Sequence, residues 1–120
     1  SMTTMTYSYR LGREVPMLSD EEFEPIVRAL DGRMERIEEY RRSHPQSALA
    51  EAVQHSGIEA LEYYERLTGV RLLHPDQLYW VQRSRYGRSC PDCGKPFRTP
   101  RAMMCTECGF NLPRGESISD

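Results

Sequence analysis

All four cysteines of this 120-residue chain lie in two short C-x-x-C-G segments near its C-terminal end. The first runs from Cys90 to Gly94 and the second from Cys105 to Gly109. Two residues between paired thiolates allow both sulfurs to point into one turn, and the following glycine allows the backbone to fold around them. Two such turns supply the four tetrahedral ligands that Zn²⁺ favours. The sequence therefore predicts one structural Zn²⁺, bound by Cys90, Cys93, Cys105 and Cys108.

This spacing predicts a zinc ribbon over residues 88–112, with a short hairpin over residues 95–104 that is tipped at Thr99 and Pro100. A segment of this size has too little apolar core to fold without its metal. Disulfides would need an oxidising compartment, and a C-x-x-C redox motif would occur singly at the start of a helix in an α/β fold. Four sulfur ligands close the coordination shell, so we expect a structural zinc and not a catalytic one. The basic residues expected to offset the charge of the zinc tetrathiolate are Lys95, Arg98 and Arg101.

The residues ahead of the ribbon carry a helical hydrophobic pattern. Residues 19–22 read Ser-Asp-Glu-Glu, a capping box, and apolar residues then recur at three- and four-residue intervals as far as Tyr40. This predicts a helix from Ser19 to about Arg42, with a kink or a separate opening turn near Pro25. Further helices are expected after Ser47, from Ile58 to Thr68, and from His74 to Gly87. The residues expected to share one core are Phe23, Ile26, Leu30, Ile37, Leu61, Tyr64, Leu67 and Leu78, and Ile58 is expected to face inward with them.

The predicted fold class is mainly α, a small helical bundle followed by a C-terminal zinc ribbon. Four segments are expected: a polar lead over residues 1–18, the helical body over 19–87, the ribbon over 88–112 and a flexible tail over 113–120. The lead alternates apolar and polar residues over a short stretch, which suits an edge strand or a docked arm.

Charge is divided unevenly along the chain. Residues 1–82 carry 9 Arg and 14 acidic residues, a net charge of −5, whereas residues 83–120 carry 7 basic and 4 acidic residues, a net charge of +3. No run approaches the roughly 18 apolar residues of a membrane span, and the first residues lack the basic and apolar regions of a secretory signal. We therefore expect a cytoplasmic protein without a membrane partner.

The remaining motifs do not indicate an enzyme. His44, His55 and His74 are scattered, and no spacing couples one of them to a carboxylate and a nucleophile. A Gly-rich phosphate loop, a nucleophile elbow and a metalloprotease motif are all lacking from the sequence. We expect a binding protein without catalytic residues.

Two kinds of partner fit the charge pattern. An acidic helical surface can recognise a basic protein, and the residues proposed for that contact are Glu35, Glu38, Glu39, Glu59, Glu62 and the surface aromatic Tyr63. The alternative partner is nucleic acid, bound through Arg85, Arg98 and Arg101 around the aromatic residues Tyr86 and Phe97. The acidic body would repel a phosphate backbone, so the protein partner is favoured.

Several segments resemble one group of small proteobacterial proteins that join a helical body to such a ribbon. They are Met17–Glu22, Ala60–Gly69, Tyr86-Gly87, Cys90–Pro96 and Arg98–Ala102, and the resemblance covers roughly residues 5–112. Members are often encoded beside polymorphic toxin genes, where cognate immunity proteins are found. The resemblance implies a bacterial immunity protein that neutralises a toxin domain by binding it, and it implies no catalytic residues. A zinc-ribbon nucleic-acid-binding or regulatory protein is the alternative.

Overall fold

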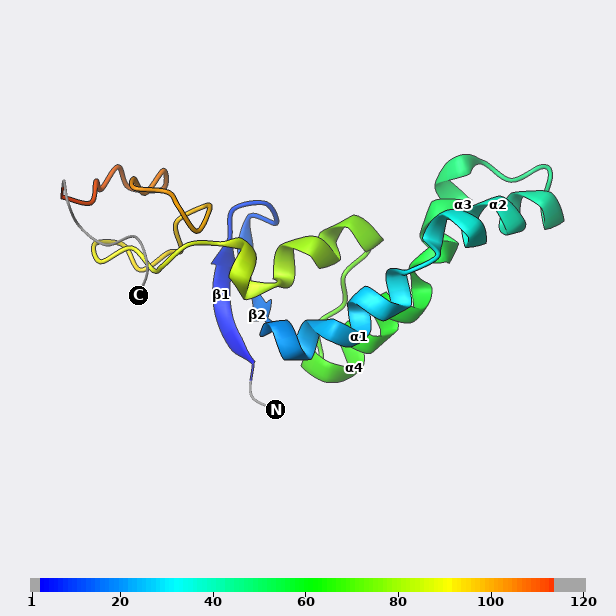
Figure 1. Cartoon of the computed structure of the whole chain (residues 1–120), viewed down its shortest axis with the longest axis horizontal. Coiled ribbons are helices and arrows are strands. Elements are labelled where there is room, and N and C mark those ends of the chain that lie inside the picture. The colour runs from blue at the N-terminus through cyan, green and yellow to red at the C-terminus, as the bar shows by residue number, and fades with distance from the viewer. Residues whose placement is uncertain (1–2, 114–120) are drawn as a thin grey trace. The chain divides into compact units, whose positions relative to one another are not determined.

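The computed structural model describes residues 3–113, which divide into two compact units (Figure 1). The first unit is discontinuous in sequence, because it combines residues up to Asp20 with residues from Trp80 onward. The second unit, Glu21–Tyr79, is inserted between these two parts. Of the tail expected over residues 113–120, only Pro113 lies within the described residues.

The first unit begins with a β-hairpin. Strand β1 (Thr4–Ser8) pairs antiparallel with β2 (Arg13–Met17), in a register that sets Ser8 opposite Arg13. Gly12 closes the turn with φ 70° and donates its N–H to the Ser8 carbonyl at 2.8 Å. A residue with a side chain would be strained at this φ. Of the two forms expected for the polar lead, the structure therefore has a strand, and a second strand pairs with it.

The chain returns to this hairpin after the inserted unit. Leu18 donates its N–H to the Val81 carbonyl at 2.8 Å, and Arg83 donates its N–H to the Leu18 carbonyl at 2.9 Å. These residues lie in and beside two short 3₁₀ helices, Pro75–Val81 and Arg83–Arg85. The sequence predicted an α-helix from His74 to Gly87, which was wrong. Helices of the two kinds have similar side-chain spacing over so few residues.

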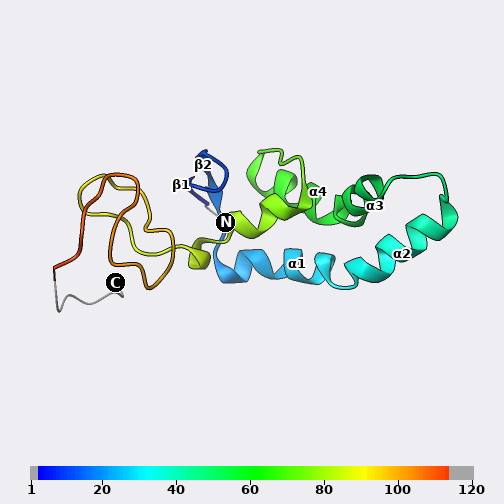
Figure 2. The same ribbon diagram turned by 90° about the horizontal axis from the view of Figure 1, so that it is seen from above.

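The second unit is built from four α-helices, and α1 starts at the end of the first unit. They are α1 (Asp20–Leu30), α2 (Arg33–Ser43), α3 (Leu49–Ser56) and α4 (Ile58–Thr68). Figure 2 shows α1 and α2 along one side and α3 and α4 returning along the other. The described part of the chain is thus rich in helix, with a two-stranded sheet as an addition to the expected class. None of its helices has both the length and the apolar composition needed to cross a membrane.

The helix predicted over residues 19–42 is broken in two. Gly32 has φ 78°, a left-handed conformation that ends a right-handed helix, whereas Pro25 is accommodated inside α1. Arg36 stabilises the break, because its guanidinium donates to the carbonyls of Ala29 at 2.6 Å, Asp31 at 2.8 Å and Ser56 at 3.3 Å. It therefore satisfies carbonyls at the C-terminal ends of both α1 and α3.

Most of the buried apolar residues of the second unit lie on α1 and α4. The buried residues on these helices are Phe23, Ile26, Leu30, Ala60, Leu61 and Tyr64, as the apolar spacing predicted, with Ile26 and Tyr64 fully buried. The prediction was wrong for Ile58, which is 42% exposed, while Ile37 and Leu67 are only half-buried. Helix α2, which packs against α3, has no buried residue.

Candidate metal centre

The four cysteine sulfurs converge within the first unit, where all of them lie within 4.8 Å of one another. The sulfurs of Cys90 and Cys108 are 3.7 Å apart, and those of Cys93 and Cys105 are 3.6 Å apart. Four sulfurs placed tetrahedrally at about 2.3 Å from a zinc ion lie about 3.8 Å from one another. The thiols are free, and their separations are far above the roughly 2.05 Å of a disulfide. The geometry is therefore that of a site for one Zn²⁺.

Each C-x-x-C-G segment forms a tight turn around its pair of sulfurs. In the first, Cys90 donates its N–H to Lys95 at 2.8 Å and Gly94 donates to Cys90 at 2.9 Å. In the second, the corresponding distances are both 2.7 Å, from Cys105 to Phe110 and from Gly109 to Cys105. The two glycines have φ of 81° and 86°, which explains why glycine follows each second cysteine.

The equivalence extends beyond the cysteines, because Cys105 follows Cys90 by 15 residues and the flanking hydrogen bonds keep the same offset. Phe97 donates to the Arg88 carbonyl and Leu112 donates to the Met103 carbonyl, both at 2.8 Å. Isolated bridges at Ser89↔Pro96 and Met104↔Asn111 follow the same rule. The ribbon is therefore a duplicated turn. The hairpin expected over residues 95–104 was wrong, because pairing occurs within each turn and residues 98–102 connect the two turns.

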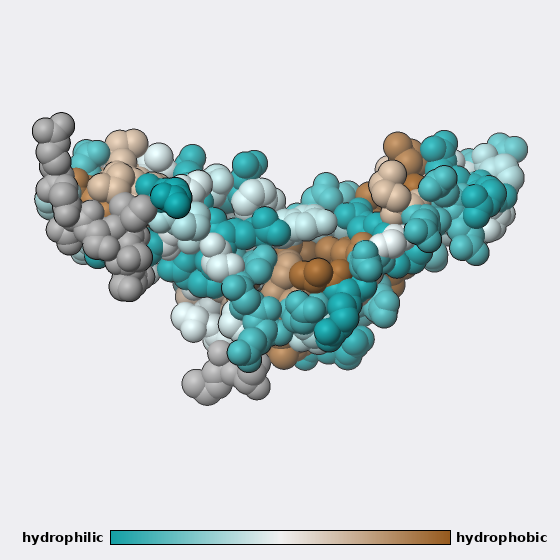
Figure 3. Space-filling view, in the orientation of Figure 1, coloured by the Kyte–Doolittle hydropathy of each residue, from teal (hydrophilic) through white to brown (hydrophobic). Residues whose placement is uncertain are grey.

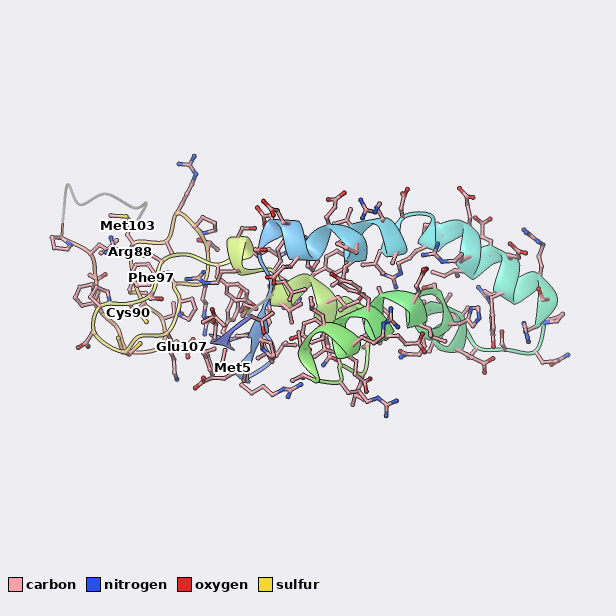
Figure 4. All side chains as sticks on the ribbon, turned by 90° about the horizontal axis from the view of Figure 1, so that it is seen from below. Met5, Arg88, Cys90, Phe97, Met103 and Glu107 are labelled. Atoms are coloured by element: carbon pink, nitrogen blue, oxygen red, sulfur yellow. The ribbon has the colours of Figure 1, made fainter. Side chains whose placement is uncertain are left out.

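The apolar core of the ribbon is small. It consists of Cys90, Phe97, Cys105 and Leu112, with partly buried Ala102 and Phe110 packed against it. Cys90 and Phe97 of this core are labelled in Figure 4. The neighbouring Gly87 has no room for a side chain, since a Cβ there would lie 2.3 Å from the Thr99 carbonyl oxygen. With so few apolar side chains in the ribbon, we expect its order to depend on the metal.

The pKa values of the thiols indicate that a cation between the four sulfurs is favourable. Burial raises the pKa of the Cys90 thiol, but hydrogen bonds from the backbone of Cys93 and Asp92 outweigh it, and the pKa is lowered to about 7. At Cys108 the backbone N–H of Phe110 lowers the pKa, whereas partial desolvation and the other three cysteines raise it to about 12. One thiol thus ionises readily and another resists, as expected when several thiolates would share a small space. A bound Zn²⁺ removes this conflict.

The basic residues near the ribbon face other groups. Lys95 Nζ lies 4.3 Å from the ring centre of Tyr7, and the Arg98 guanidinium donates to Glu107 at 3.0 Å. The N–H of Asp92 lies closer to the sulfurs, at 3.4 Å from Cys90 Sγ. The charge compensation expected from Lys95 and Arg98 is therefore indirect, because both cations are held by neighbouring side chains.

The structure also reveals a cluster of cations and aromatic rings that the sequence did not identify. Its members, which we call the cation-aromatic cluster, are Tyr7, Tyr9, Arg10, Trp80, Lys95 and Arg98. Tyr9 and Trp80 meet edge to face at 6.4 Å, and Arg10 lies 4.4 Å from the Trp80 ring centre and Arg98 4.4 Å from that of Tyr9. The aromatic residues proposed from sequence were Tyr86 and Phe97, but both are buried. The available signal was the spacing of Tyr7 and Tyr9, which lie in β1 and in the turn just after it.

The residues proposed for a protein partner lie on two helices of the second unit. Glu35, Glu38 and Glu39 are exposed on α2, and Glu59 and Glu62 are exposed on α4. The face of the chain drawn in Figure 3 is mostly hydrophilic, with a few hydrophobic patches. Tyr63 differs from the prediction of a surface aromatic, because it is half-buried and its hydroxyl donates to the Glu22 carbonyl at 3.1 Å. It fastens α4 to α1.

The residues proposed for nucleic acid lie in the first unit. Arg85, Arg98 and Arg101 are all exposed, and Arg98 is also paired with Glu107.

In the described part of the chain, the four cysteines are the one group of three or more Cys, His, Asp and Glu side chains that could share a metal ion. Comparisons of the chain with protein-family models, with curated proteins and with solved structures found no match.

Proposed function

We propose that this chain is a zinc-stabilised, non-enzymatic binding protein that contacts a protein partner through its second, helical unit. The charge of that unit carries the proposal. Residues 21–79 hold 12 acidic residues against 7 Arg, a net charge of −5, whereas residues 3–20 and 80–113 hold 4 acidic against 8 basic residues. An acidic surface attracts a basic partner, speeds association and discriminates against partners of like charge.

The zinc has a supporting role in this proposal. Four sulfur ligands leave no position for water or substrate, so the metal orders the ribbon and takes no part in chemistry. The partner is a toxin domain, and the protein neutralises it by occupying a basic surface that the toxin needs. The resemblance to small proteobacterial proteins encoded beside polymorphic toxin genes supports this reading, as does the acidic surface. Both partners then meet in the bacterial cytoplasm.

Co-expression with the toxin encoded by the neighbouring gene tests the proposal. The chain should restore growth and bind the purified toxin domain at nanomolar affinity, which corresponds to about −12 kcal/mol. The double charge reversals Glu35→Lys with Glu38→Lys and Glu59→Lys with Glu62→Lys should weaken binding in at least one of the two patches. Reversal of exposed Glu14 in the first unit is the matched control. Failure to restore growth, without measurable binding, would reject the immunity function.

A second candidate function is nucleic-acid binding, which the cation-aromatic cluster favours. Aromatic rings beside Arg and Lys are the side chains on which single-stranded bases stack. Trp80, the one tryptophan of the chain, lies in this cluster, so its fluorescence reports binding of an oligonucleotide. If this function holds, neutralising Arg85, Arg98 and Arg101 should abolish quenching. Affinity for a single strand should then fall with salt by about 0.7 log units per log unit of salt for each phosphate contacted.

A further inference from the structure

A groove of about 540 Å³ lies in the second unit where α1 gives way to α2. Its apolar wall is formed by Leu30, Met34, Ile37, Val53 and Tyr79. Asp31 and Glu35 also line it, and both are exposed. The lining of the groove therefore combines apolar and acidic side chains.

Met34 is the least protected residue of this wall. Its side chain is 71% exposed at the start of α2, a helix that has no buried residue. The fold gains little from a methionine at such a position. A long, unbranched thioether can adapt to the shape of an incoming side chain, which makes exposed methionines useful on binding surfaces.

The walls of the groove are held firmly by contacts of the second unit itself. Arg36 ties the end of α1 to the end of α3, as described above, and Arg33 donates to Ser56 Oγ at 3.2 Å. Arg33 also lies 3.9 Å from Asp76, and its side chain is only 17% exposed. A groove with fixed walls binds without a large cost of ordering.

The charge available to a ligand at this groove is negative. Arg33, the lining cation, is occupied by Ser56 and Asp76. Within residues 3–113, neither Asp31 nor Glu35 has an ion-pair partner. A second copy of the helical unit would bring its own net charge of −5, and a nucleic acid would bring its phosphates, so both would be repelled.

We propose that this groove binds a basic amphipathic segment of the protein partner. The segment sets one or two large apolar side chains against Met34, Ile37 and Val53, and it places Lys or Arg beside Asp31 and Glu35. The inference rests on the proposed function, in that it assigns a surface and a recognition chemistry to the protein contact.

The first test uses a synthetic 14-residue peptide with leucines on one helical face and lysines on the other, titrated into the zinc-loaded full chain. The matched peptide has glutamate in place of every lysine. NMR signals of the Met34 methyl group and the neighbouring amides should shift with the lysine peptide and not with the glutamate peptide. Met34→Glu and Glu35→Lys should each weaken binding by about tenfold or more, or about 1.4 kcal/mol.

Two control variants test whether the effect is local. Val27→Glu changes a 49% exposed apolar residue on α1, and Glu14→Lys reverses an exposed charge on β2, both outside the lining of the groove. Each should leave the affinity within about twofold, about 0.4 kcal/mol. Circular dichroism verifies that every variant is folded, and Met34→Ala provides a milder change at the same position.

The proposal is overturned if both peptides bind equally, if the shifts map elsewhere, or if Met34→Glu and Met34→Ala bind as tightly as the natural chain. Self-association through the groove, detected by sedimentation, would also overturn it.

Experiments with the natural partner distinguish this inference from the proposed function. If a toxin domain binds tightly and Met34→Glu has no effect, the groove assignment fails and the immunity function stands. If the lysine peptide occupies the groove and no toxin is neutralised, the immunity function fails and the groove assignment stands.

Discussion

The hydroxyl oxygens of Tyr86 and Ser8 lie 2.7 Å apart, although 78 residues separate them in the chain. Tyr86 donates its proton to the Trp80 carbonyl at 2.5 Å, so Ser8 is the donor between the two hydroxyls. The N–H of Leu11 donates in turn to Ser8 Oγ at 3.2 Å. Because Ser8 and Tyr86 are both buried, this chain of hydrogen bonds fixes the β-hairpin to the segment that leads into the ribbon.

Replacing Tyr86 with Phe breaks this chain at its centre. The Ser8 hydroxyl and the Trp80 carbonyl would each lose a partner inside the first unit, so we expect a loss of about 1–3 kcal/mol in the free energy of unfolding. Urea denaturation followed by Trp80 fluorescence measures it. Tyr9→Phe is the matched control, because its hydroxyl accepts only an exposed contact from Arg10. Equal stability of the two variants would contradict the prediction.

Removing the metal should unfold the ribbon and leave the helices of the second unit intact. Protein purified without added zinc should contain about one equivalent, because four sulfur ligands complete one site. After chelation, amide protection should be lost over residues 87–112, while helical circular dichroism from α1–α4 persists. Cys93→Ser should behave like the chelated protein. A ribbon that stays protected without metal would contradict the prediction.

Arg36→Met should destabilise the second unit. The substitution removes the hydrogen bonds to the carbonyls of Ala29, Asp31 and Ser56. A hydrogen bond from a charged donor contributes about 1.5–3 kcal/mol to stability. A net loss of about 2 kcal/mol is expected by thermal or urea denaturation. Arg28→Met is the control, since Arg28 is 68% exposed and makes only a 3.5 Å contact with Glu24. Its loss should be below about 0.5 kcal/mol.

Two adjacent residues of α1 test the orientation of the helix. Ile26 is fully buried and Val27 is 49% exposed. Ile26→Ala should cost about 2–5 kcal/mol in the free energy of unfolding, because it leaves a cavity in the core of the second unit. Val27→Ala should change stability by about 0.5 kcal/mol or less. Chemical denaturation of both variants measures the loss in the free energy of unfolding. Similar losses would mean that the buried face of α1 lies elsewhere.

Tyr40 should titrate above its ordinary value. Its hydroxyl donates to the Glu51 carboxylate at 2.5 Å, and this hydrogen bond, followed by desolvation and the nearby negative charge, raises the pKa of Tyr40 above 10. Since the folded value exceeds the unfolded one, the stabilising contribution is complete below pH 10 and is lost as the pH rises through the folded value. NMR titration of the Tyr40 ring measures this, and in Glu51→Gln the pKa should return toward 10.

The sequence predicted the zinc ligands and the faces of α1 and α4, because cysteine spacing and helical periodicity are local properties. The sequence did not predict the break between α1 and α2 at Gly32. One glycine inside a helix costs only about 1 kcal/mol, so the outcome depends on tertiary contacts such as those of Arg36. The cation-aromatic cluster was hidden for a similar reason. Tyr7, Trp80 and Arg98 are far apart in the chain and meet only in the folded first unit.

The insertion of the second unit into the first has a consequence for how the chain folds. The hydrogen bonds between Leu18 and Val81 close a loop of about 60 residues, and holding the ends of such a flexible loop together costs about 4 kcal/mol in entropy. A helical unit that folds first brings these ends close beforehand and removes much of that cost. During synthesis, β1 and β2 leave the ribosome well before Val81 and Tyr86. The hairpin therefore cannot form its contacts with these residues until they have been synthesised. We therefore expect helices first, then docking of the hairpin, with metal capture as the closing step of maturation.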